Sequence, residues 1–278
     1  MLPALSAAEL ISHLPRRPPD SHKGMFGTVA VIGGSRGMVG APLLAARAAL
    51  KLGAGCVRVG MIAEPHLPVD PLQPELMIDT ASEVLRQKQF SVLVMGCGMG
   101  TQNVGMLAYG LDCPVPLVLD ADALNLLAEY AELRALLSKR MAPTVFTPHP
   151  GEAAHLLNWP APTVQADRVT AVQQLAQQLG GPVVLKGFHS LCADVDGKVF
   201  INNSGNPGMS TAGMGDVLAG MTASFLAQNM TPMHALCLAV HLHGAAGDTF
   251  ARHDAIGMTA SELTEQARHL LHQWQKNH

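Results

Sequence analysis

Short apolar runs alternate with longer stretches of helical character through most of the chain, and this alternation limits the fold more than any other feature. The apolar runs are residues 28–32, 56–61, 91–95, 116–119, 144–146, 183–185 and 198–201. Helical stretches lie between most of them, at residues 42–51, 82–88, 104–111, 123–137 and 164–179. This order predicts βαβ units and an α/β fold, with a mainly parallel central sheet flanked by helices.

A low content of charge agrees with such a fold. Charged residues make up 14% of the chain, against about 25% in an average soluble protein, and the mean hydropathy is +0.21. Strands that are apolar almost throughout are typical of a sheet covered on both faces. No linker, repeat or low-complexity segment interrupts the 278 residues, so residues 1–278 are predicted to form a single domain.

An uncharged segment, residues 217–247, is long enough to cross a bilayer. It contains Gln228, three histidines and a helix-breaking step from Asn229 to Pro232, so two buried helices of ordinary length are expected instead. The N-terminus has no basic start, and Glu9 interrupts its apolar residues, so no signal peptide is expected. Ser6 and Glu9 instead predict a capping box that opens a short helix.

Net charge and cysteine spacing exclude several classes of protein. A net charge of −3 and a pI near 6.5 argue against binding to nucleic acid or to an anionic membrane. The five cysteines are odd in number and widely spaced, which argues against a disulfide framework and a zinc site. A reducing, cytoplasmic compartment is therefore predicted.

Glycine-rich or polar clusters follow nearly every predicted strand. They lie at residues 33–37, 96–100, 120–125, 147–152, 186–189 and 206–216. In open α/β sheets ligands bind outside the carboxyl ends of the strands. The clusters therefore predict one ligand-binding edge.

The segment 206–216 carries the strongest signal for chemistry. Gly208, Gly213 and Gly215 precede a predicted helix, and this arrangement favours an anion such as phosphate. Asp216 would stand beside the anion, where it could take a proton from a substrate hydroxyl that attacks a phosphoryl group. Asp216 could also be a plain N-cap, but a cap does not explain the three glycines.

Other polar residues at the same edge leave alternatives open. Asp120 and Asp122 could hold a hydrated Mg²⁺; for Asp122 a helix cap is preferred, so Asp120 is the candidate metal ligand. His149, between two prolines, favours a ligand contact, and Lys186 favours a phosphate or ribose contact over a surface position. The loop Gly34-x-x-Gly37-x-x-Gly40 lacks the G-x-G-x-x-G pattern of a dinucleotide-binding turn. His241 and His243, two residues apart on a helix, are interpreted as core or interface histidines.

Five segments together resemble one family. Residues 22–27, 31–35, 119–125, 147–152 and 206–220 are similar, in order, to the ADP-dependent (S)-NAD(P)H-hydrate dehydratase family of the ribokinase-like superfamily. The resemblance implies a three-layer sandwich and a lyase that repairs hydrated NADH and NADPH (NADHX and NADPHX). ADP would phosphorylate the ring hydroxyl with release of AMP, and loss of phosphate would restore the double bond.

The same resemblance implies the site residues. Those implied to contact the hydrate are Ala41, Gly100 or Gly98, His149 and Asp216, with Asp216 as the base. Those implied to contact the nucleotide are Lys186, Gly187, Phe188, His189, Ser190, Gly213 and Gly215, with the backbone of 213–215 as the anion hole. Mg²⁺ and ADP are the implied cofactor and co-substrate.

Several further expectations follow. Many relatives carry an epimerase domain in front of this one. Only about twenty residues precede the first of the five segments here, so the NAD(P)H-hydrate epimerase is expected to be a separate protein. The low charge could also hide subunit contacts, as in a homo-oligomer such as a tetramer. Met214 stands where many members of the superfamily have a smaller residue, and this leaves the choice between ADP and ATP open. The competing functions are a small-molecule kinase of the same fold, of the hydroxyethylthiazole or hydroxymethylpyrimidine type, and a nucleotide-binding regulator without turnover.

Overall fold

A computed structural model describes residues 2–66, 68–252 and 256–277, and these residues form one sheet of nine strands. The spatial order is β3-β2-β1-β4-β5-β6-β7-β8-β9. Pairing is parallel from β3 through β7, while β8 is antiparallel to both β7 and β9. The strands are β1 Thr28–Gly33, β2 Cys56–Met61, β3 Met77–Thr80, β4 Val92–Met95, β5 Leu117–Leu119, β6 Thr144–Phe146, β7 Val183–Leu185, β8 Leu191–Ala193 and β9 Val199–Ile201.

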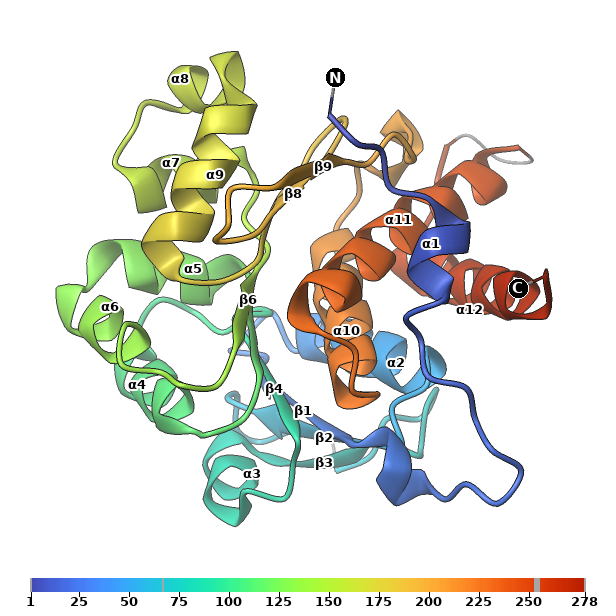
Figure 1. Cartoon of the computed structure of the whole chain (residues 1–278). Helices are drawn as coiled ribbons and strands as arrows, with labels where there is room; N and C mark the ends of the chain where they lie inside the picture. Colours follow the sequence, from blue (N-terminus) through green and yellow to red (C-terminus); the bar gives the residue numbers. More distant parts are fainter. Residues whose placement is uncertain (1, 67, 253–255, 278) are drawn as a thin grey trace.

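Two layers of helices cover the sheet, one on each face (Figure 1). One layer is α1 Ala7–Ile11, α2 Gly40–Lys51, α10 Met214–Ala227, α11 Pro232–Ala251 and α12 Ala260–Asn277. The other is α3 Ala81–Gln87, α4 Val104–Asp112, α5 Ala121–Glu129, α6 Ala131–Leu137, α7 Pro150–Leu157, α8 Ala161–Ala166 and α9 Arg168–Leu179. The predicted α/β sandwich with a mainly parallel sheet is confirmed.

Strand β1 shows why the strands are apolar throughout. Val29 and Val31 point into the core under α2 and α10, whereas Ala30 and Ile32 point into the core on the other face. All four are fully buried. Because successive strand residues face opposite sides, a sheet covered twice leaves no position for a charged side chain. Within the described part of the chain, no helix is both long and apolar enough to cross a membrane.

The structure departs from the predicted elements in five places. Strands β3 and β8 were not predicted, because β3 has the mixed sequence MIDT and β8 follows β7 without a helix between them, outside the alternation of strands and helices. The expected helices 123–137 and 164–179 are each divided in two, at Tyr130 and at Asp167. The capping box at Ser6 is wrong, since the Ser6 side chain makes no capping hydrogen bond. Pairing of residues 3–5 with Ile201 of β9 places the start of α1 instead.

The strand order reverses between β1 and β4, and the loops that follow these two strands meet there. Backbone N–H groups of Gly34 and Ser35 donate to the carbonyls of Cys97 (3.2 Å) and Gly98 (2.7 Å). Helix α10 packs against β1, β4 and β5 at this point. Such a reversal leaves a crevice at the carboxyl edge, which is where open α/β sheets bind ligands.

Close contact between α10 and α2 depends on Gly220. A Cβ at this position would lie 2.0 Å from the backbone oxygen of Ala45, and a backbone atom cannot move aside. We expect Gly220→Ala to lower the free energy of unfolding by about 3 kcal/mol. Gly105 is the control, because it is exposed on α4 and a Cβ added there would meet no atom within 4 Å. Gly105→Ala is expected to raise that free energy by roughly 0.5–1 kcal/mol. Urea unfolding measures both, and equal stabilities would contradict the packing argument.

Candidate active site

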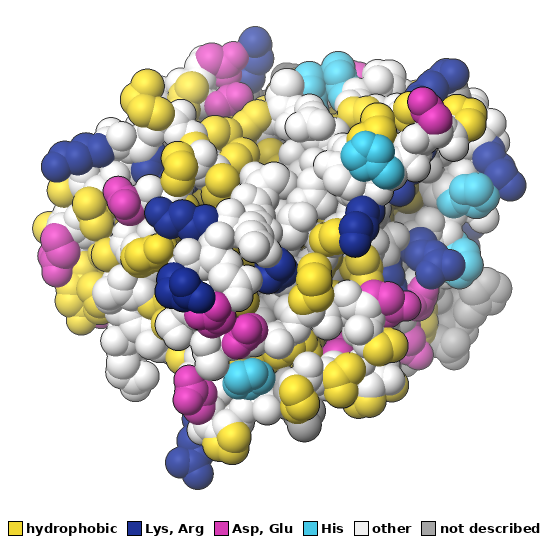
Figure 2. Space-filling view, turned by 90° about the horizontal axis from the view of Figure 1, so that it is seen from below, with side chains coloured by type: hydrophobic (Ala, Val, Ile, Leu, Met, Phe, Trp, Pro, Cys, Tyr) yellow, Lys and Arg dark blue, Asp and Glu magenta, His cyan; other side chains and the backbone are white. Residues whose placement is uncertain are grey.

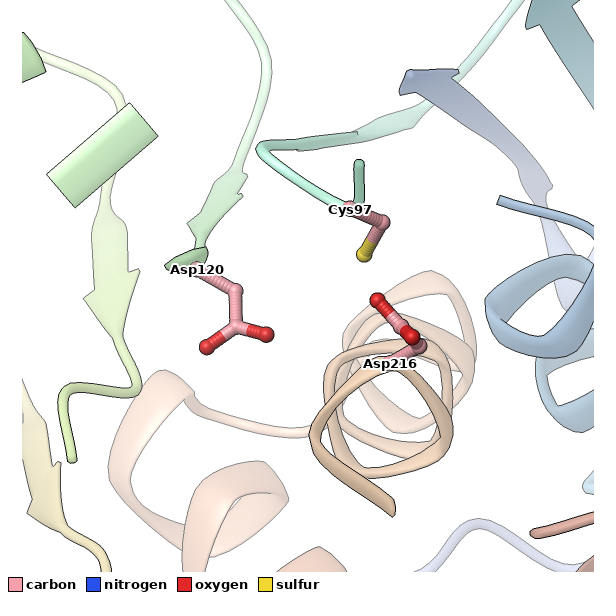
Figure 3. Close-up of side chains that lie close together, drawn as sticks. All are labelled: Cys97, Asp120 and Asp216. Carbon is pink, nitrogen blue, oxygen red and sulfur yellow. The ribbon is translucent and has the colours of Figure 1, made fainter. Parts of the chain in front are cut away.

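Three side chains from separate parts of the sequence meet at the carboxyl edge of the sheet (Figure 3). Cys97 follows β4, Asp120 follows β5, and Asp216 lies in the first turn of α10. Their sulfur and carboxylate oxygens all lie within 4.8 Å of one another. Asp120 is 2% exposed, and Cys97 is fully buried. Two carboxylates are therefore held close together in a poorly solvated space.

Lys186, after β7, is the counter-ion of Asp120. Its Nζ lies 2.7 Å from Asp120 Oδ1, an oxygen that also accepts a 2.7 Å hydrogen bond from Thr147 Oγ1. Burial alone would lower the pKa of Lys186, but the charges of Asp120 and Glu152 raise it above its usual value. The ammonium therefore stays protonated and available to a phosphate. The sequence predicted a phosphate or ribose contact for Lys186 but not this buried ion pair.

Asp216 lies where a general base needs to be. Helix α10 begins at Met214, with Gly213 as N-cap at φ +90°, so Asp216 is in the first turn and is not the cap. Burial, reinforced by the charge of Asp120, raises the pKa of Asp216 to about 6. A carboxyl with a pKa near neutrality is suited to accept a proton.

The backbone before Asp216, where the sequence predicts an anion site, borders the same space. A Cβ on Gly215 would lie 3.4 Å from both Asp120 Oδ2 and Lys186 Nζ, so the Gly215 backbone faces the same space as the two charges. Free N–H groups at a helix start and its dipole attract negative charge. On the face seen in Figure 2, lysine and arginine side chains are scattered among acidic and apolar ones and do not gather into a basic patch. Backbone groups and Lys186 would therefore carry phosphate recognition.

A pocket of about 420 Å³ adjoins these groups. It is formed by the loop after β7, the segment after β9, the start of α10 and the second half of α11; its lining includes Lys186, Gly187, Phe188, His189, Ser190, Asn202, Asn206, Gly215 and His243. The five residues 186–190, predicted to contact the nucleotide, are thus brought together with Gly215. Phe188 is 79% exposed, an apolar ring left open at this pocket.

The residues expected to contact the hydrate do not line that pocket. Ala41 at the start of α2 lies against Gly98, where a Cβ would be 3.1 Å from Ala41 Cβ. Gly100 donates its N–H to Asp122 Oδ2 at 2.7 Å. The preferred cap role of Asp122 is wrong: Asp120 holds the N-cap position, which leaves the Asp122 carboxylate free to reach this loop.

His149 is the N-cap of α7, and its side chain belongs to a capping box with Glu152. Burial, with the positive charge of Lys186, lowers the pKa of His149, so the ring is neutral near pH 7. Burial raises the pKa of Glu152 to about 7. Glu152 Oε2 also lies 3.9 Å from Lys186 Nζ, which connects the His149 loop with the nucleotide pocket.

Two polar residues of α11 that shape the pocket were missed or only partly understood from the sequence. Asp248 accepts hydrogen bonds from the N–H of Gly205 (2.9 Å) and from Asn206 Nδ2 (3.1 Å), and so ties the glycine-rich segment to α11. His243 Nε2 lies 3.0 Å from the carbonyl of Met214, and burial lowers the pKa of His243 to about 4. The available signal was the presence of polar residues in an otherwise apolar helix.

Comparison with known proteins agrees with this geometry. Residues 29–269 match the NAD(P)H-hydrate dehydratase family. The chain is 45% identical over 264 residues to the ADP-dependent (S)-NAD(P)H-hydrate dehydratase of Neisseria meningitidis, an alignment covering 91% of this chain and 88% of that protein. The chain belongs to the NAD(P)H-hydrate dehydratase family. Other relatives are bifunctional NAD(P)H-hydrate repair enzymes, such as that of Escherichia coli, of which the chain spans half the length.

Solved structures of similar fold support the membership. The ADP/ATP-dependent NAD(P)H-hydrate dehydratase of Bacillus subtilis, co-crystallised with ATP and Mg²⁺, is 30% identical with a TM-score of 0.86, covering 98% of this chain and 99% of that one. A ribokinase-like superfamily protein of Enterococcus faecalis is also 30% identical, with a TM-score of 0.84 and coverage of 98% and 96%. The predicted ribokinase-like fold is confirmed.

Proposed function

We propose that this protein catalyses the ADP-dependent dehydration of the S form of hydrated NADH and NADPH, and so restores NADH and NADPH. The observation that carries the proposal is the position of Asp216: a half-buried carboxylate of raised pKa, in the first turn of α10, beside the Gly213–Gly215 backbone and Lys186. This arrangement joins a base to a phosphate site, as transfer of a phosphoryl group to a hydroxyl requires.

The reaction proceeds in two stages. Asp216 accepts the proton of the ring hydroxyl while the hydroxyl oxygen attacks the β-phosphorus of ADP. The bond between this phosphorus and the bridging oxygen breaks, and AMP leaves. The Gly213–Gly215 N–H groups and Lys186 stabilise the charge on the transferred group. The ring nitrogen then donates its electron pair, the carbon–oxygen bond breaks, phosphate leaves, and loss of a proton from the adjacent carbon restores the double bond.

Mg²⁺ is the proposed metal, and the donor set fits it. Asp120 supplies a hard carboxylate oxygen, and a hydrated Mg²⁺ needs only one or two carboxylates besides phosphate. Burial raises the pKa of Cys97 well above its usual value, so its protonated sulfur is no ligand. One oxygen of Asp120 is taken by Lys186 and Thr147, which leaves Oδ2 for the metal. When bound, the ion would neutralise charge on the phosphates.

The contacts of individual residues with the two substrates are part of the same proposal. Residues Lys186–Ser190 with Gly213 and Gly215 bind ADP, and Ala41, Gly98 or Gly100, His149 and Asp216 contact the hydrate. Residues 1–278 act as one domain, in the cytoplasm, and an NAD(P)H-hydrate epimerase acts in the same pathway. Five free cysteines support a reducing compartment. We further propose a homo-oligomer such as a tetramer, which light scattering tests by its mass.

A turnover assay tests the function directly. Purified protein is incubated with hydrated NADH and ADP, and then with ATP in place of ADP. The dehydratase restores NADH absorbance and releases phosphate and AMP. A stable phosphorylated product without NADH would indicate a small-molecule kinase, and nucleotide binding without any product would indicate a regulator.

The pH dependence of kcat/KM reports the base in the free enzyme. Because Asp216 must be ionised and its pKa is raised to about 6, activity is expected to fall as the pH drops below about 6, and to be retained above it. Asp120, Asp122, Lys186 and Cys97 are the titratable groups around it. Glu152→Gln removes the other carboxyl of raised pKa. If this variant keeps the fall in activity at low pH, the fall is assigned to Asp216. A flat profile between pH 5 and 8 would contradict the assignment.

A further inference from the structure

Glu152 is a buried carboxylate that the proposed reaction does not use. It is 4% exposed and lies in the first turn of α7. Its Oε2 accepts a 2.7 Å hydrogen bond from the backbone N–H of His149, and its Oε1 lies 3.2 Å from His149 Nε2. A carboxylate is costly to bury unless its oxygens are paired. Both oxygens of Glu152 are paired with the same residue.

The imidazole of His149 is held from two sides. Its Nδ1 accepts hydrogen bonds from the N–H groups of Gly151 (3.0 Å) and Glu152 (3.2 Å). A ring nitrogen that accepts cannot carry the proton, so Nε2 carries it, and this nitrogen lies 3.2 Å from Glu152 Oε1. The side chain of His149 is nevertheless 56% exposed, so the ring is open to a ligand while Nδ1 is held by the helix start and Nε2 lies beside a carboxylate.

We propose that Glu152 is a positioning residue, which fixes the orientation and tautomer of His149 so that the ring presents a preformed surface to the hydrated nicotinamide. The proposal rests on the proposed function, in which His149 contacts the hydrate. It assigns His149 a contact through its ring face and carbon edge rather than proton transfer, which leaves Asp216 as the base. A side chain that is already held in its binding orientation contacts a ligand more favourably, because it loses less conformational freedom on binding.

A carboxylate is required at position 152, and an amide of the same size does not suffice. Glutamine would offer one oxygen where two donors, the N–H of His149 and His149 Nε2–H, now find two oxygens. The other tautomer of His149 would free Nε2 but would set Nδ1–H against the N–H groups of Gly151 and Glu152. In either arrangement one N–H group is set against another N–H group.

The nucleotide half of the site depends less on Glu152. Lys186 Nζ lies 3.9 Å from Glu152 Oε2 but only 2.7 Å from Asp120 Oδ1, and Asp120 remains in a Glu152 variant. Loss of the Glu152 charge should therefore leave Lys186 in place. A defect in hydrate binding with ADP binding retained is the expected signature.

The test compares Glu152→Gln with Glu262→Gln. Glu262 forms an equivalent capping box with Thr259 at the start of α12, outside the candidate site. We expect Glu152→Gln to raise KM for hydrated NADH about tenfold, with the Kd of ADP changed less than about threefold. Glu262→Gln should leave both constants unchanged. Glu152→Asp, which keeps a carboxylate, should recover part of the affinity for the hydrate.

Nitrogen NMR of the imidazoles gives a readout that does not depend on turnover. In the unmodified protein the His149 signals, assigned by their loss in His149→Asn, should be those of a neutral ring protonated at Nε2; Glu152→Gln should shift or broaden them. The proposal is overturned if Glu152→Gln binds ADP but keeps the normal KM and His149 signals, or if Glu262→Gln has the same effect. It is also overturned if Glu152→Gln and Glu152→Asp both lose ADP binding. If the unmodified protein restores no NADH, the proposed function fails, and the NMR result still decides the role of Glu152.

Discussion

Asp216→Asn is expected to lower kcat about 10²–10⁴-fold, while ADP binds with nearly normal affinity. The amide keeps the size of the side chain and its place in the first turn of α10, but it cannot accept the proton of the substrate hydroxyl. The contacts proposed for ADP are with Lys186–Ser190 and the Gly215 backbone, which line the pocket and which the substitution leaves intact. Steady-state kinetics with hydrated NADH and calorimetric titration with ADP measure the two effects.

Asp196→Asn is the matched control for that experiment. Asp196 lies in the turn between β8 and β9, where it pairs with Lys198 on the surface. Its substitution should leave kcat unchanged. If Asp216→Asn retained more than about a tenth of the normal kcat, Asp216 would not be the base, and the arrangement at the start of α10 would serve phosphate binding alone.

Lys186→Met is expected to abolish measurable ADP binding and also to lower the free energy of unfolding by about 3 kcal/mol. Both effects have one origin, because the ammonium that would meet the phosphates is also the counter-ion of Asp120, a carboxylate that is 2% exposed. Removing it leaves a buried carboxylate that has lost its counter-ion and keeps a hydrogen bond from the hydroxyl of Thr147. Urea unfolding and titration with ADP measure the two losses separately.

The double variant Lys186→Met/Asp120→Asn separates stability from function. A neutral amide at position 120 needs no counter-ion, so much of the lost stability should return while ADP binding stays absent. A double variant no more stable than Lys186→Met would contradict the pairing of Lys186 with Asp120. Normal ADP affinity in Lys186→Met would contradict the role of Lys186 in the nucleotide site.

Structural features that depend only on residues close together in the sequence were predicted well. The apolar runs of β1, β4 and β7 could only be strands of a sheet covered on both faces, and Gly213, Gly215 and Asp216 could be assigned to a helix start that attracts phosphate. These inferences need only the period of a strand and the unpaired N–H groups of a helix, which neighbouring residues determine. Strand β8 was missed because it pairs antiparallel with β7 without a helix between them, and the alternation of strands and helices gives no signal for such a strand.

The pairing of residues far apart in the sequence was decided by the tertiary structure. Lys186 and Asp120 are 66 residues apart, and only the order of β5, β6 and β7 in the sheet brings their side chains together. The role of Asp122 was mistaken because its partner, Gly100, lies on another loop. Local sequence thus determined the fold class and predicted a ligand-binding edge and a base, since each of these inferences uses backbone geometry within one element. The tertiary structure decided which charges are buried together, because burial and pairing depend on neighbours that the sequence places far away.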